Sequence, residues 1–311
     1  MEPELIEEKE TVTMGDRLKN YEKETPIKYL IIPPYKSFVM RLDGNSFSRY
    51  TVGFMKPFDR RFMSAMILTM NDLIAKFNAV TGYTHSDEIT LVFQAMCTKE
   101  EFDNNKNKST HLHNGKSQKL NSLVASYCSV RFNYHICNLI KGTASEKDYN
   151  EETLEMINSH VAIFDSRIIV FPDDKEHEVV NLLMWRSVTD CHRNAVSTYG
   201  RHYMSPKNMQ GLHSGQIIDL LKVNHNFDWE KDVPLYYKHG VYGKRELYKV
   251  NVSLPSGEQI DATRKRVVNK CFKIKFSEKM VEQIMAKVWQ DNTDEVKYHS
   301  LTVNGDGVKL D

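Results

Sequence analysis

Two aspartates, Asp43 and Asp87, are placed where their carboxylates could share metal ions. Asp43 ends an alternating apolar segment, residues 37–43 (SFVMRLD), and Asp87 lies in the polar bend before another, residues 89–93. Paired carboxylates suit Mg²⁺, which prefers oxygen ligands and shares its coordination shell with phosphates. Two such ions could activate an attacking hydroxyl and stabilise a leaving phosphate oxygen. The pair therefore indicates metal-dependent chemistry on phosphates, although most isolated Asp-Gly pairs such as Asp43-Gly44 only cap turns.

The elements around these acids predict a sheet that brings them together. Apolar residues recur at positions 62, 66, 73, 77 and 80, with Thr69 at the same spacing, which is that of a helix that packs one face on a sheet. The order of strand, helix and acid-bearing hairpin matches the first half of a ferredoxin-like βαββαβ unit. In that unit the first and third strands are neighbours. We therefore expect Asp43 and Asp87 to meet at one edge of the sheet.

Later segments complete an α+β fold with an antiparallel sheet and helices on one face. Helical patterns cover about residues 119–138 and 176–200, and a strand is expected at 168–172, after a polar insert at 98–115. We expect a flexible N-terminus at residues 1–16, a catalytic domain at 17–240 and a basic, helical C-terminal extension at 241–311. In that extension, the basic stretch 264–275 could follow an RNA backbone or could be a solvated amphipathic element.

Composition sets limits on where the protein works and what it binds. The 311 residues are 41% hydrophobic and 27% charged, which is ordinary for a globular protein, and no apolar run is long enough to cross a membrane. The acidic N-terminus does not resemble a secretory signal, and five scattered cysteines favour free thiols. A cytoplasmic location is expected, with a mitochondrial one left open. With a net charge of +1, any RNA must bind to local basic surface.

Cationic residues near the ends of elements could bind phosphates. Lys56 precedes Pro57 at an expected helix start, where a cation and free backbone amides both suit a triphosphate. Lys116, Lys119 and Arg167 also lie at or beside the ends of elements. Each of them taken alone is more simply a solvated surface residue, so they gain weight only as part of a larger pattern.

Several short motifs in one consistent order resemble the tRNA-histidine guanylyltransferase family. Residues 41–50 (RLDGNSFSRY) resemble its RxDGxxFxRF signature, residues 54–59 (FMKPFD) its F-x-K-P-x-D segment, and residues 86–89 (SDEI) its SDEY hairpin. Residues 119–126 (KLNSLVAS), 164–167 (FDSR) and 185–194 (WRSVTDCHRN) resemble later motifs. The match spans roughly residues 16–240, and it implies a polymerase-like palm that acts on the 5′ end of RNA.

The resemblance also implies roles for residues of this sequence. Two Mg²⁺ ions would be held by Asp43, Asp87 and the carbonyl of Gly44, and Glu88 and Lys56 would act in catalysis beside the two aspartates. The partners would be tRNA and nucleoside triphosphates, with ATP or GTP as the activating nucleotide and a homotetramer as the assembly. His192 and Asn194 would contact the nucleotide and the tRNA end. Nucleotide-binding residues would be Asp43, Gly44, Asn45, Ser46, Phe47, Ser48, Ser86 and Asp87, with Lys56, Lys116, Lys119 and Arg167 on the triphosphates.

One segment departs from the histidine-specific enzymes. They carry H-I-N-N-L-Y-N where residues 192–198 read HRNAVST. This difference favours the guanylyltransferase-like branch, which repairs truncated tRNA 5′ ends by template-dependent 3′-to-5′ addition. The alternatives are a strict tRNA-histidine guanylyltransferase, a nucleotide cyclase with a similar palm, and a non-catalytic RNA-binding protein. The intact acids and Lys56 count against the last of these, because RNA binding alone does not require metal ligands.

Overall fold

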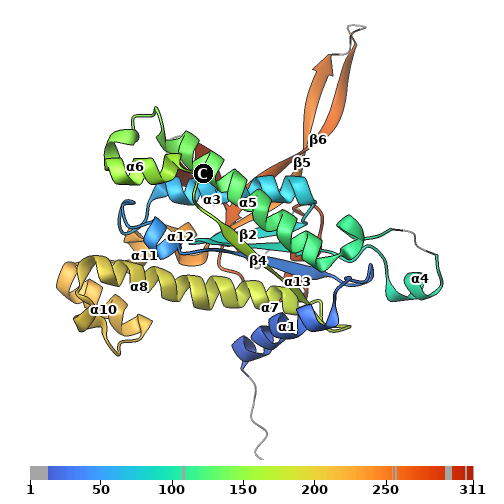
Figure 1. Cartoon of the computed structure of the whole chain (residues 1–311), viewed down its shortest axis with the longest axis horizontal. Coiled ribbons are helices and arrows are strands. Elements are labelled where there is room, and N and C mark those ends of the chain that lie inside the picture. Colours follow the sequence, from blue (N-terminus) through green and yellow to red (C-terminus); the bar gives the residue numbers. More distant parts are fainter. Residues whose placement is uncertain are drawn as a thin grey trace, which may run out of the picture.

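The computed structural model describes residues 13–106, 109–253, 255, 258–290, 296–304 and 307–310. At its centre is an antiparallel sheet with the strand order β4-β1-β3-β2-β5-β6-β7-β8 (Figure 1). The first four strands have the order of a ferredoxin-like unit, and β1 pairs with both β3 and β4. The mixed fold and the adjacency of the first and third strands are thereby confirmed. The strands are β1 (Phe38–Gly44), β2 (Thr81–His85), β3 (Glu88–Phe93), β4 (Phe164–Val170), β5 (Val241–Ser253), β6 (Gln259–Cys271), β7 (His299–Asn304) and β8 (Gly307–Leu310).

Two long helices cover one face of the sheet. α3 (Arg60–Phe77) begins where the Asp59 carboxylate accepts hydrogen bonds from two backbone amides, and α5 (Ser117–Ile140) packs beside it. Their apolar sides meet Met40 and Leu42 of β1 and the inward residues of β3. This is the helix–sheet packing that the apolar spacing predicts.

Helices also cover the opposite face, so the prediction that helices lie on one face only is wrong. Alternate residues of the same strands, such as Val39 and Ile169, pack against α1 (Met14–Lys28), α7 (Glu178–Met184) and α13 (Glu278–Met285). Strands buried on both faces carry apolar residues at successive positions. That pattern is present in residues 38–40 and 168–170, and it is the signal for the second helical layer.

One continuous helical stretch links this second layer to the edge of the sheet. α7 passes through a π-helical segment, Trp185–Cys191, into α8 (His192–Tyr203). The prediction of a helix over residues 176–200 is confirmed in substance. A π-helical segment turns the following side chains relative to a plain α-helix, and such segments are frequent at functional sites.

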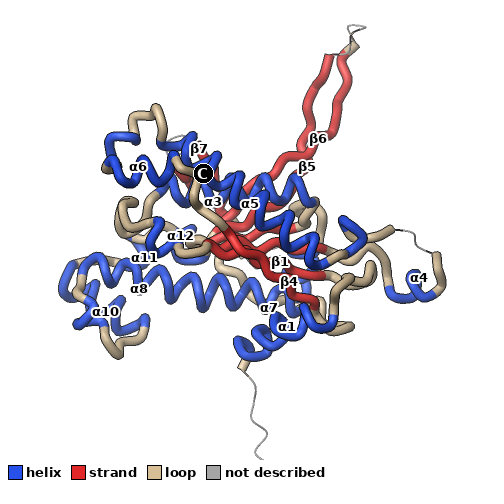
Figure 2. The backbone as a smooth tube through the Cα atoms, in the orientation of Figure 1, coloured by secondary structure: helices blue, strands red, loops and turns tan. Residues whose placement is uncertain are grey.

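The C-terminal part is mostly strand, so the prediction of a helical extension is wrong. β5 pairs with β2 along residues 241–243, and β6, β7 and β8 then continue the palm sheet. In residues 246–253, polar and apolar residues alternate, and no long apolar run occurs. This pattern fits a hairpin whose strands are solvated over much of their length. The tube drawing shows the hairpin leaving the body of the molecule (Figure 2).

The structure bears on only part of the N-terminal and insert predictions. Residues 1–12 lie outside the described residues, whereas residues 14–16 open α1 rather than a flexible tail. The insert 98–115 contains a short helix, and its residues 107–108 also lie outside the described part. The remaining short helices are α2 (Phe47–Tyr50), α4 (Lys99–Asp103), η1 (Leu112–Gly115), η2 (Glu146–Asp148), α6 (Glu151–Asn158), α9 (Pro206–Met209), α10 (Ser214–His225), α11 (Trp229–Asp232) and α12 (Leu235–His239).

None of the described helices has the length and apolar character needed to cross a bilayer.

Candidate active site

The two acid-bearing segments meet at one end of the sheet, as the sequence predicts. Asp43 lies directly opposite Glu88 in the β1–β3 pairing, and Asp87 occupies the tight turn between β2 and β3. The backbone amide of Gly44 donates a hydrogen bond to the carbonyl oxygen of Asp87 over 3.1 Å. The ends of two segments far apart in sequence are thus fixed against each other by the sheet and by this bond.

The end of the sheet that carries Asp43 and Asp87, called the acid edge below, has negative charge that nearby cations balance only in part. Burial raises the pKa of Asp43, and the neighbouring Glu88 carboxylate raises it further. Burial also raises the pKa of Asp87, whose carboxylate accepts a hydrogen bond of 2.9 Å from the Ser86 hydroxyl. A raised carboxyl pKa means that the site disfavours the ionised form. A cation at this edge would relieve that penalty.

The donor set at this edge fits a magnesium site. Asp43 and Asp87 offer carboxylate oxygens, which are the ligands that Mg²⁺ prefers. Gly44 lies between them, and a Cβ atom at this position would come within 2.4 Å of the Phe47 ring. Only glycine therefore fits against Phe47 here, and the backbone at residue 44 stays accessible for close approach of an ion or a phosphate.

Glu88 belongs to a partly buried ion-pair network that also includes Asp43, because the Arg41 guanidinium donates to the Asp43 carboxylate over 3.1 Å. The Glu88 carboxylate pairs with Arg41 at 3.3 Å and with Arg186 at 3.0 Å, and Arg186 also pairs with Asp190 at 2.9 Å. The possible ligand atoms of His85, Glu88 and Asp190 all lie within 4.8 Å of one another. Because Arg41 and Arg186 pair with Glu88, and Arg186 and Arg193 pair with Asp190, both carboxylates already have cationic partners, and we read this group as structural rather than as a metal site.

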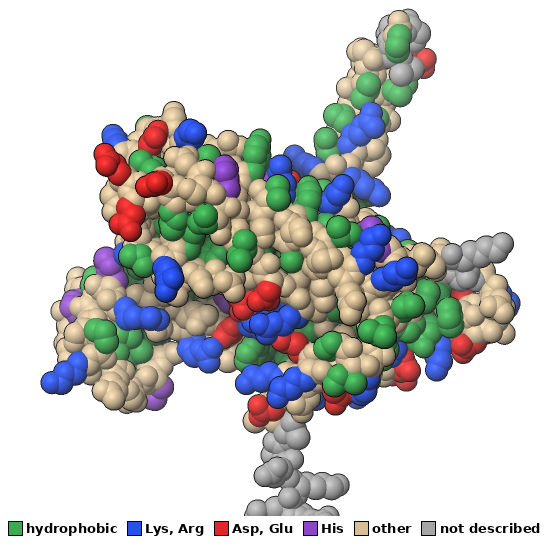
Figure 3. All heavy atoms as spheres, viewed as in Figure 1, with side chains coloured by type: hydrophobic (Ala, Val, Ile, Leu, Met, Phe, Trp, Pro, Cys, Tyr) green, Lys and Arg blue, Asp and Glu red, His purple; other side chains and the backbone are tan. Residues whose placement is uncertain are grey.

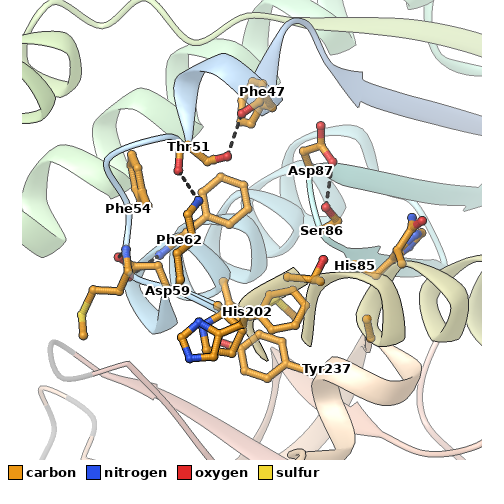
Figure 4. A pocket seen from close by; sticks show the side chains of 18 of the residues that line it. Phe47, Thr51, Phe54, Asp59, Phe62, His85, Ser86, Asp87, His202 and Tyr237 are labelled. Atoms are coloured by element: carbon orange, nitrogen blue, oxygen red, sulfur yellow. Dashed lines mark hydrogen bonds between the residues drawn. The ribbon is translucent and has the colours of Figure 1, made fainter. Parts of the chain in front are cut away.

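A cavity of about 770 Å³ opens beside Asp87 and extends along α8. Its walls come from the turn between β2 and β3, the segment from α2 to the start of α3, and the side of α8 that carries Asn194 (Figure 4). Ser48, Lys56 and Ser86 also line it. Phe58 and Tyr237, whose rings stack at 4.2 Å, form an aromatic floor. The volume and the mixed lining suit a nucleotide-sized ligand.

Lys56 borders this cavity, although not at a helix start. The exposed Lys56 ammonium donates to the Thr51 carbonyl over 2.7 Å. α3 begins only at Arg60, with Asp59 as its N-cap, so Pro57 precedes the helix rather than forming its first turn. The prediction of Pro57 in the first helical turn is therefore wrong. The position of Lys56 on the cavity wall still leaves its charge free to meet a phosphate.

Lys116 lies toward the other end of β1 from the acids, and Lys119 lies in the first turn of α5. Residue 116 forms a bridge with Ile31, just before the start of β1, whereas Asp43 lies near its end. On α5, the Ser129 hydroxyl accepts a hydrogen bond from the Phe164 amide, at the acid end of the sheet. Lys119 is ten residues earlier, which is roughly 15 Å along the helix. Neither lysine lines the cavity.

Arg167 is on the acid side of the sheet but is already paired. It lies opposite Arg41 in the β1–β4 pairing, and its guanidinium donates to Glu22 of α1 at 2.9 Å. Asp165 is a further partner at 3.6 Å. A triphosphate contact by Arg167 would therefore have to replace or share the Glu22 carboxylate.

The turn after Gly44 separates predicted nucleotide-binding residues into exposed and buried ones. Asn45 and Ser46 are exposed, and Ser46 has the left-handed φ of 58°. Phe47 has its ring in the core, 4.9 Å from the Phe164 ring, while part of the residue borders the cavity. The Phe47 side chain therefore anchors the turn to the hydrophobic core.

His192 and Asn194 follow the π-helical segment on α8. Asn194 lines the cavity, whereas the His192 ring packs against Trp229 with ring centroids 5.6 Å apart. Burial lowers the pKa of His192, and the nearby Lys273 charge lowers it further. The structure places Asn194, but not His192, among the cavity residues.

Sequence reasoning assigned no role to His85, Arg186 or Asp190. His85 is buried behind the acid turn, and neither of its ring nitrogens has a hydrogen-bond partner among the described residues. Arg186 and Asp190 are four residues apart, and this spacing on a predicted helix places them on one side of it. That spacing was the available signal for the ion pair, whereas their link to Glu88 depends on the packing of the helix on the sheet.

Comparison with known proteins identifies a single family. Residues 15–172 match the model of the tRNAHis guanylyltransferase (Thg1) family. An uncharacterized protein, R259, from Acanthamoeba polyphaga mimivirus is 45% identical over 240 residues, which cover 76% of this chain and 79% of that protein. A probable tRNA(His) guanylyltransferase from Dictyostelium discoideum is 24% identical over 225 residues, covering 68% and 77% of the two chains.

Solved structures with a similar fold carry related names. A bacterial tRNA(His) guanylyltransferase-like protein in complex with ATP aligns with a TM-score of 0.56 and 26% identity, over 74% of this chain and 87% of that one. The tRNA(His) guanylyltransferase of Saccharomyces cerevisiae aligns with a TM-score of 0.53 and 19% identity, over 70% and 90% of the chains. The latter likeness concerns the fold alone.

Proposed function

Because the chain belongs to the tRNAHis guanylyltransferase family, whose members are nucleotidyltransferases acting on tRNA, we propose that it adds nucleotides to tRNA 5′ ends in the 3′-to-5′ direction and under the direction of a template strand. The observation that carries the proposal is the meeting of Asp43 and Asp87 beside a nucleotide-sized cavity. The likeness to a bacterial relative in complex with ATP, and to the same kind of protein in complex with GTP, supports a nucleoside triphosphate in that cavity.

The proposed reaction has two steps. A 5′-monophosphate on the RNA first attacks the α-phosphorus of ATP or GTP and releases pyrophosphate, which leaves an activated 5′ end. The 3′-hydroxyl of an incoming nucleotide then attacks the 5′ phosphorus of the RNA and expels the activating nucleotide. Both steps build negative charge on phosphate oxygens beside Asp43 and Asp87. A site for them must therefore supply positive charge and exclude water.

Residues of this chain would divide that task. Asp43, Asp87 and the Gly44 carbonyl would hold two Mg²⁺ ions, which when bound activate the attacking hydroxyl and stabilise the leaving oxygen. Lys56 on the cavity wall would bind a triphosphate, and Asn194 would orient the nucleotide or the RNA end from α8. Glu88 would act through Arg41 and Arg186 by fixing the acid edge, which makes it a positioning residue.

Template direction is favoured by the composition of the cavity. Base selection by protein requires polar groups matched to the base edges. The floor of the cavity is instead aromatic, with Phe58 and Tyr237 and the adjacent Tyr236. Stacking surfaces of this kind accept every base. The departure from the histidine-specific pattern at residues 193–197 lies on α8, and Asn194 and Ala195 line the same cavity. Base pairing with the RNA itself would then supply the selection.

The proposal is tested by incubating the protein with Mg²⁺, a tRNA that lacks its first 5′ nucleotide and each labelled nucleoside triphosphate in turn. Lengthening of the 5′ end by the wild type, and none by the Asp43→Asn variant, is the expected result. Extension of histidine tRNA alone would instead support the strict guanylyltransferase. Formation of a cyclic nucleotide without RNA would support the cyclase. Tight tRNA binding without any extension would identify a non-catalytic RNA-binding protein.

A further inference from the structure

The β5–β6 hairpin forms an arm that stands away from the rest of the protein (Figure 1). Among the described residues, β5 pairs with β2 through residues 241–243, and β6 pairs with β7 through residues 269–271. In the part of the chain that the structure describes, the two strands pair only with each other beyond these anchors. An exposed two-stranded ribbon is only marginally stable by itself. A projecting ribbon of this length would be stabilised by a binding partner.

The arm beyond its anchors carries a small net positive charge. Residues 246–266 contain four lysines and arginines against three acids, which gives a net charge of +1. Two neighbouring cations belong to the body instead: Lys244 is fully buried, and Arg245 donates to the backbone carbonyls of Ile74 and Ala79. Figure 3 shows Lys and Arg side chains along the lower part of the arm. The cations of the projecting part are therefore few, and their pairing and exposure decide what they can bind.

Three cations of the arm are exposed and have no ion-pair partner among the described residues: Lys249, Arg264 and Lys265. Arg266 differs, because it pairs with Glu246 at 3.3 Å and lies over the Tyr248 ring at 5.1 Å. Lys265 is opposite Leu247 in the pairing, and Arg264 is opposite Tyr248. Since successive residues of a strand point to opposite faces, the free cations project from both faces of the ribbon.

Cations on both faces suit a polyanion better than a protein surface. Protein interfaces are depleted in lysine at their centre, whereas residues 263–266 of the arm read Thr-Arg-Lys-Arg and are all exposed. A nucleic acid backbone presents rows of phosphates that can meet a ribbon from two sides, and phosphate contacts supply most of the non-specific affinity.

We infer that the β5–β6 arm binds the phosphate backbone of the RNA substrate through Lys249, Arg264 and Lys265, at a distance from the site of nucleotide addition. β5 begins opposite Thr84, next to the acid turn, and runs away from it. Lys249 is eight residues further on, which corresponds to roughly 25 Å along the strand. The contact would therefore fall on a part of the RNA other than its 5′ end. The inference depends on the proposed function only in taking tRNA as the RNA.

The test measures the binding of a fluorescein-labelled tRNA transcript by anisotropy over a range of KCl concentrations. The variant is the triple substitution Lys249→Gln, Arg264→Gln and Lys265→Gln. Three lysines that are also exposed and unpaired among the described residues, Lys141, Lys175 and Lys222, are changed to Gln in the matched control. The second probe is a short hairpin RNA that reproduces the acceptor stem alone and is too short to reach the arm.

We expect the arm variant to bind tRNA roughly 10- to 100-fold more weakly at 0.1 M salt, with a salt slope that is lower by about 2 to 3, which corresponds to three lost phosphate contacts. The control variant and the binding of the short hairpin should change less than about twofold. Extension at saturating tRNA should be unaffected. If tRNA binding depends on the arm but the wild type extends no tRNA, the proposed function is contradicted and this inference is not.

Equal weakening on both RNAs, or equal loss in the control variant, would overturn the inference. So would unchanged tRNA binding by the arm variant, or the absence of tRNA binding by the wild type. Sedimentation of the wild type and the arm variant tests the remaining explanation, which is that the arm joins copies of this chain. If the variant dissociates into smaller assemblies and loses RNA only as a result, the arm is a contact between copies of this chain.

Discussion

The backbone amide of Gly44 donates to the carbonyl oxygen of Asp87 over 3.1 Å, so the turn that follows β1 is tied directly to the turn between β2 and β3. Each of these turns carries one of the two acids that the proposed chemistry requires. The bond adds to the β1–β3 pairing, in which Asp43 lies opposite Glu88. The spacing of the acids is thus set by backbone, and a change of either side chain should leave it intact.

Asp43→Asn should abolish nucleotide addition while keeping the fold. The pKa of Asp43 is raised in the folded protein, so its ionised form destabilises the fold at neutral pH, and the neutral amide should give an equal or higher melting temperature. The matched control is Asp165→Asn, because Asp165 is the cross-strand neighbour of Asp43 on the other side. Turnover in Mg²⁺ and thermal melting are measured. Near-normal turnover of Asp43→Asn would remove it from the metal site.

Lys56→Ala should lower kcat/KM for the triphosphate by on the order of 2–3 kcal/mol, or roughly 30- to 150-fold, which is the scale of one charge-assisted contact in a preorganised site. Lys116→Ala is the comparison, since Lys116 lies outside the cavity near the other end of β1. We expect less than a threefold effect there. Steady-state kinetics at fixed tRNA provide the measurement, and equal effects of the two changes would contradict the assignment of Lys56 to the cavity wall.

Arg186→Met should destabilise the protein by about 3–5 kcal/mol, because it leaves the half-buried Glu88 and buried Asp190 carboxylates without their shared cation. Adding Glu88→Gln to Arg186→Met should recover part of this loss, since one of the two carboxylates that share Arg186 is then uncharged. Urea unfolding of the two single variants and the double variant gives the coupling energy. Strictly additive effects would mean that the network does not act as a unit.

The stability of the fold should decrease as the solution is acidified from pH 6.5 to pH 4, partly through His239. Burial lowers the pKa of His239 from 6.5 to about 4, and the charge of Lys273 contributes in the same direction. Between these values the unfolded chain binds a proton that the folded protein does not, so stability rises with pH across this window. His239→Gln should reduce that slope. If chemical unfolding at pH 4.5 and 7.5 gives the same difference for both proteins, His239 does not carry the effect.

The sequence was most informative where side-chain type and spacing reflect local structure. The acids after strand-like segments, the apolar spacing of α3 and the helical pattern through residues 176–200 all depend on neighbours in the chain. The adjacency of β1 and β3 followed from the order of the elements, which allows few topologies. These features sufficed to bring Asp43 and Asp87 together, whereas Lys56 borders the cavity without standing at the predicted helix start.

The remaining features depend on contacts between distant segments. The ion pairs of Arg186 with Glu88 require the π-helical segment to pack on β3, and the pairing of Arg167 with Glu22 requires α1 to lie across β4. The C-terminal strands carry alternating polar residues because they are solvated on both faces, so they lack the apolar face by which a sheet strand is recognised. Lys116 and Lys119 were assigned by likeness of motif, and motif order does not specify distance.

Base selection at the site of addition is the most direct test of the proposed activity. The measurement is single-nucleotide extension of a 5′-truncated tRNA in which the base opposite the missing position is changed through A, C, G and U. Each template should be extended only with its complementary nucleotide, because in the proposed mechanism pairing with the RNA, and not the protein, supplies the discrimination between bases. Addition of G regardless of the opposing base, and only to histidine tRNA, would contradict the account.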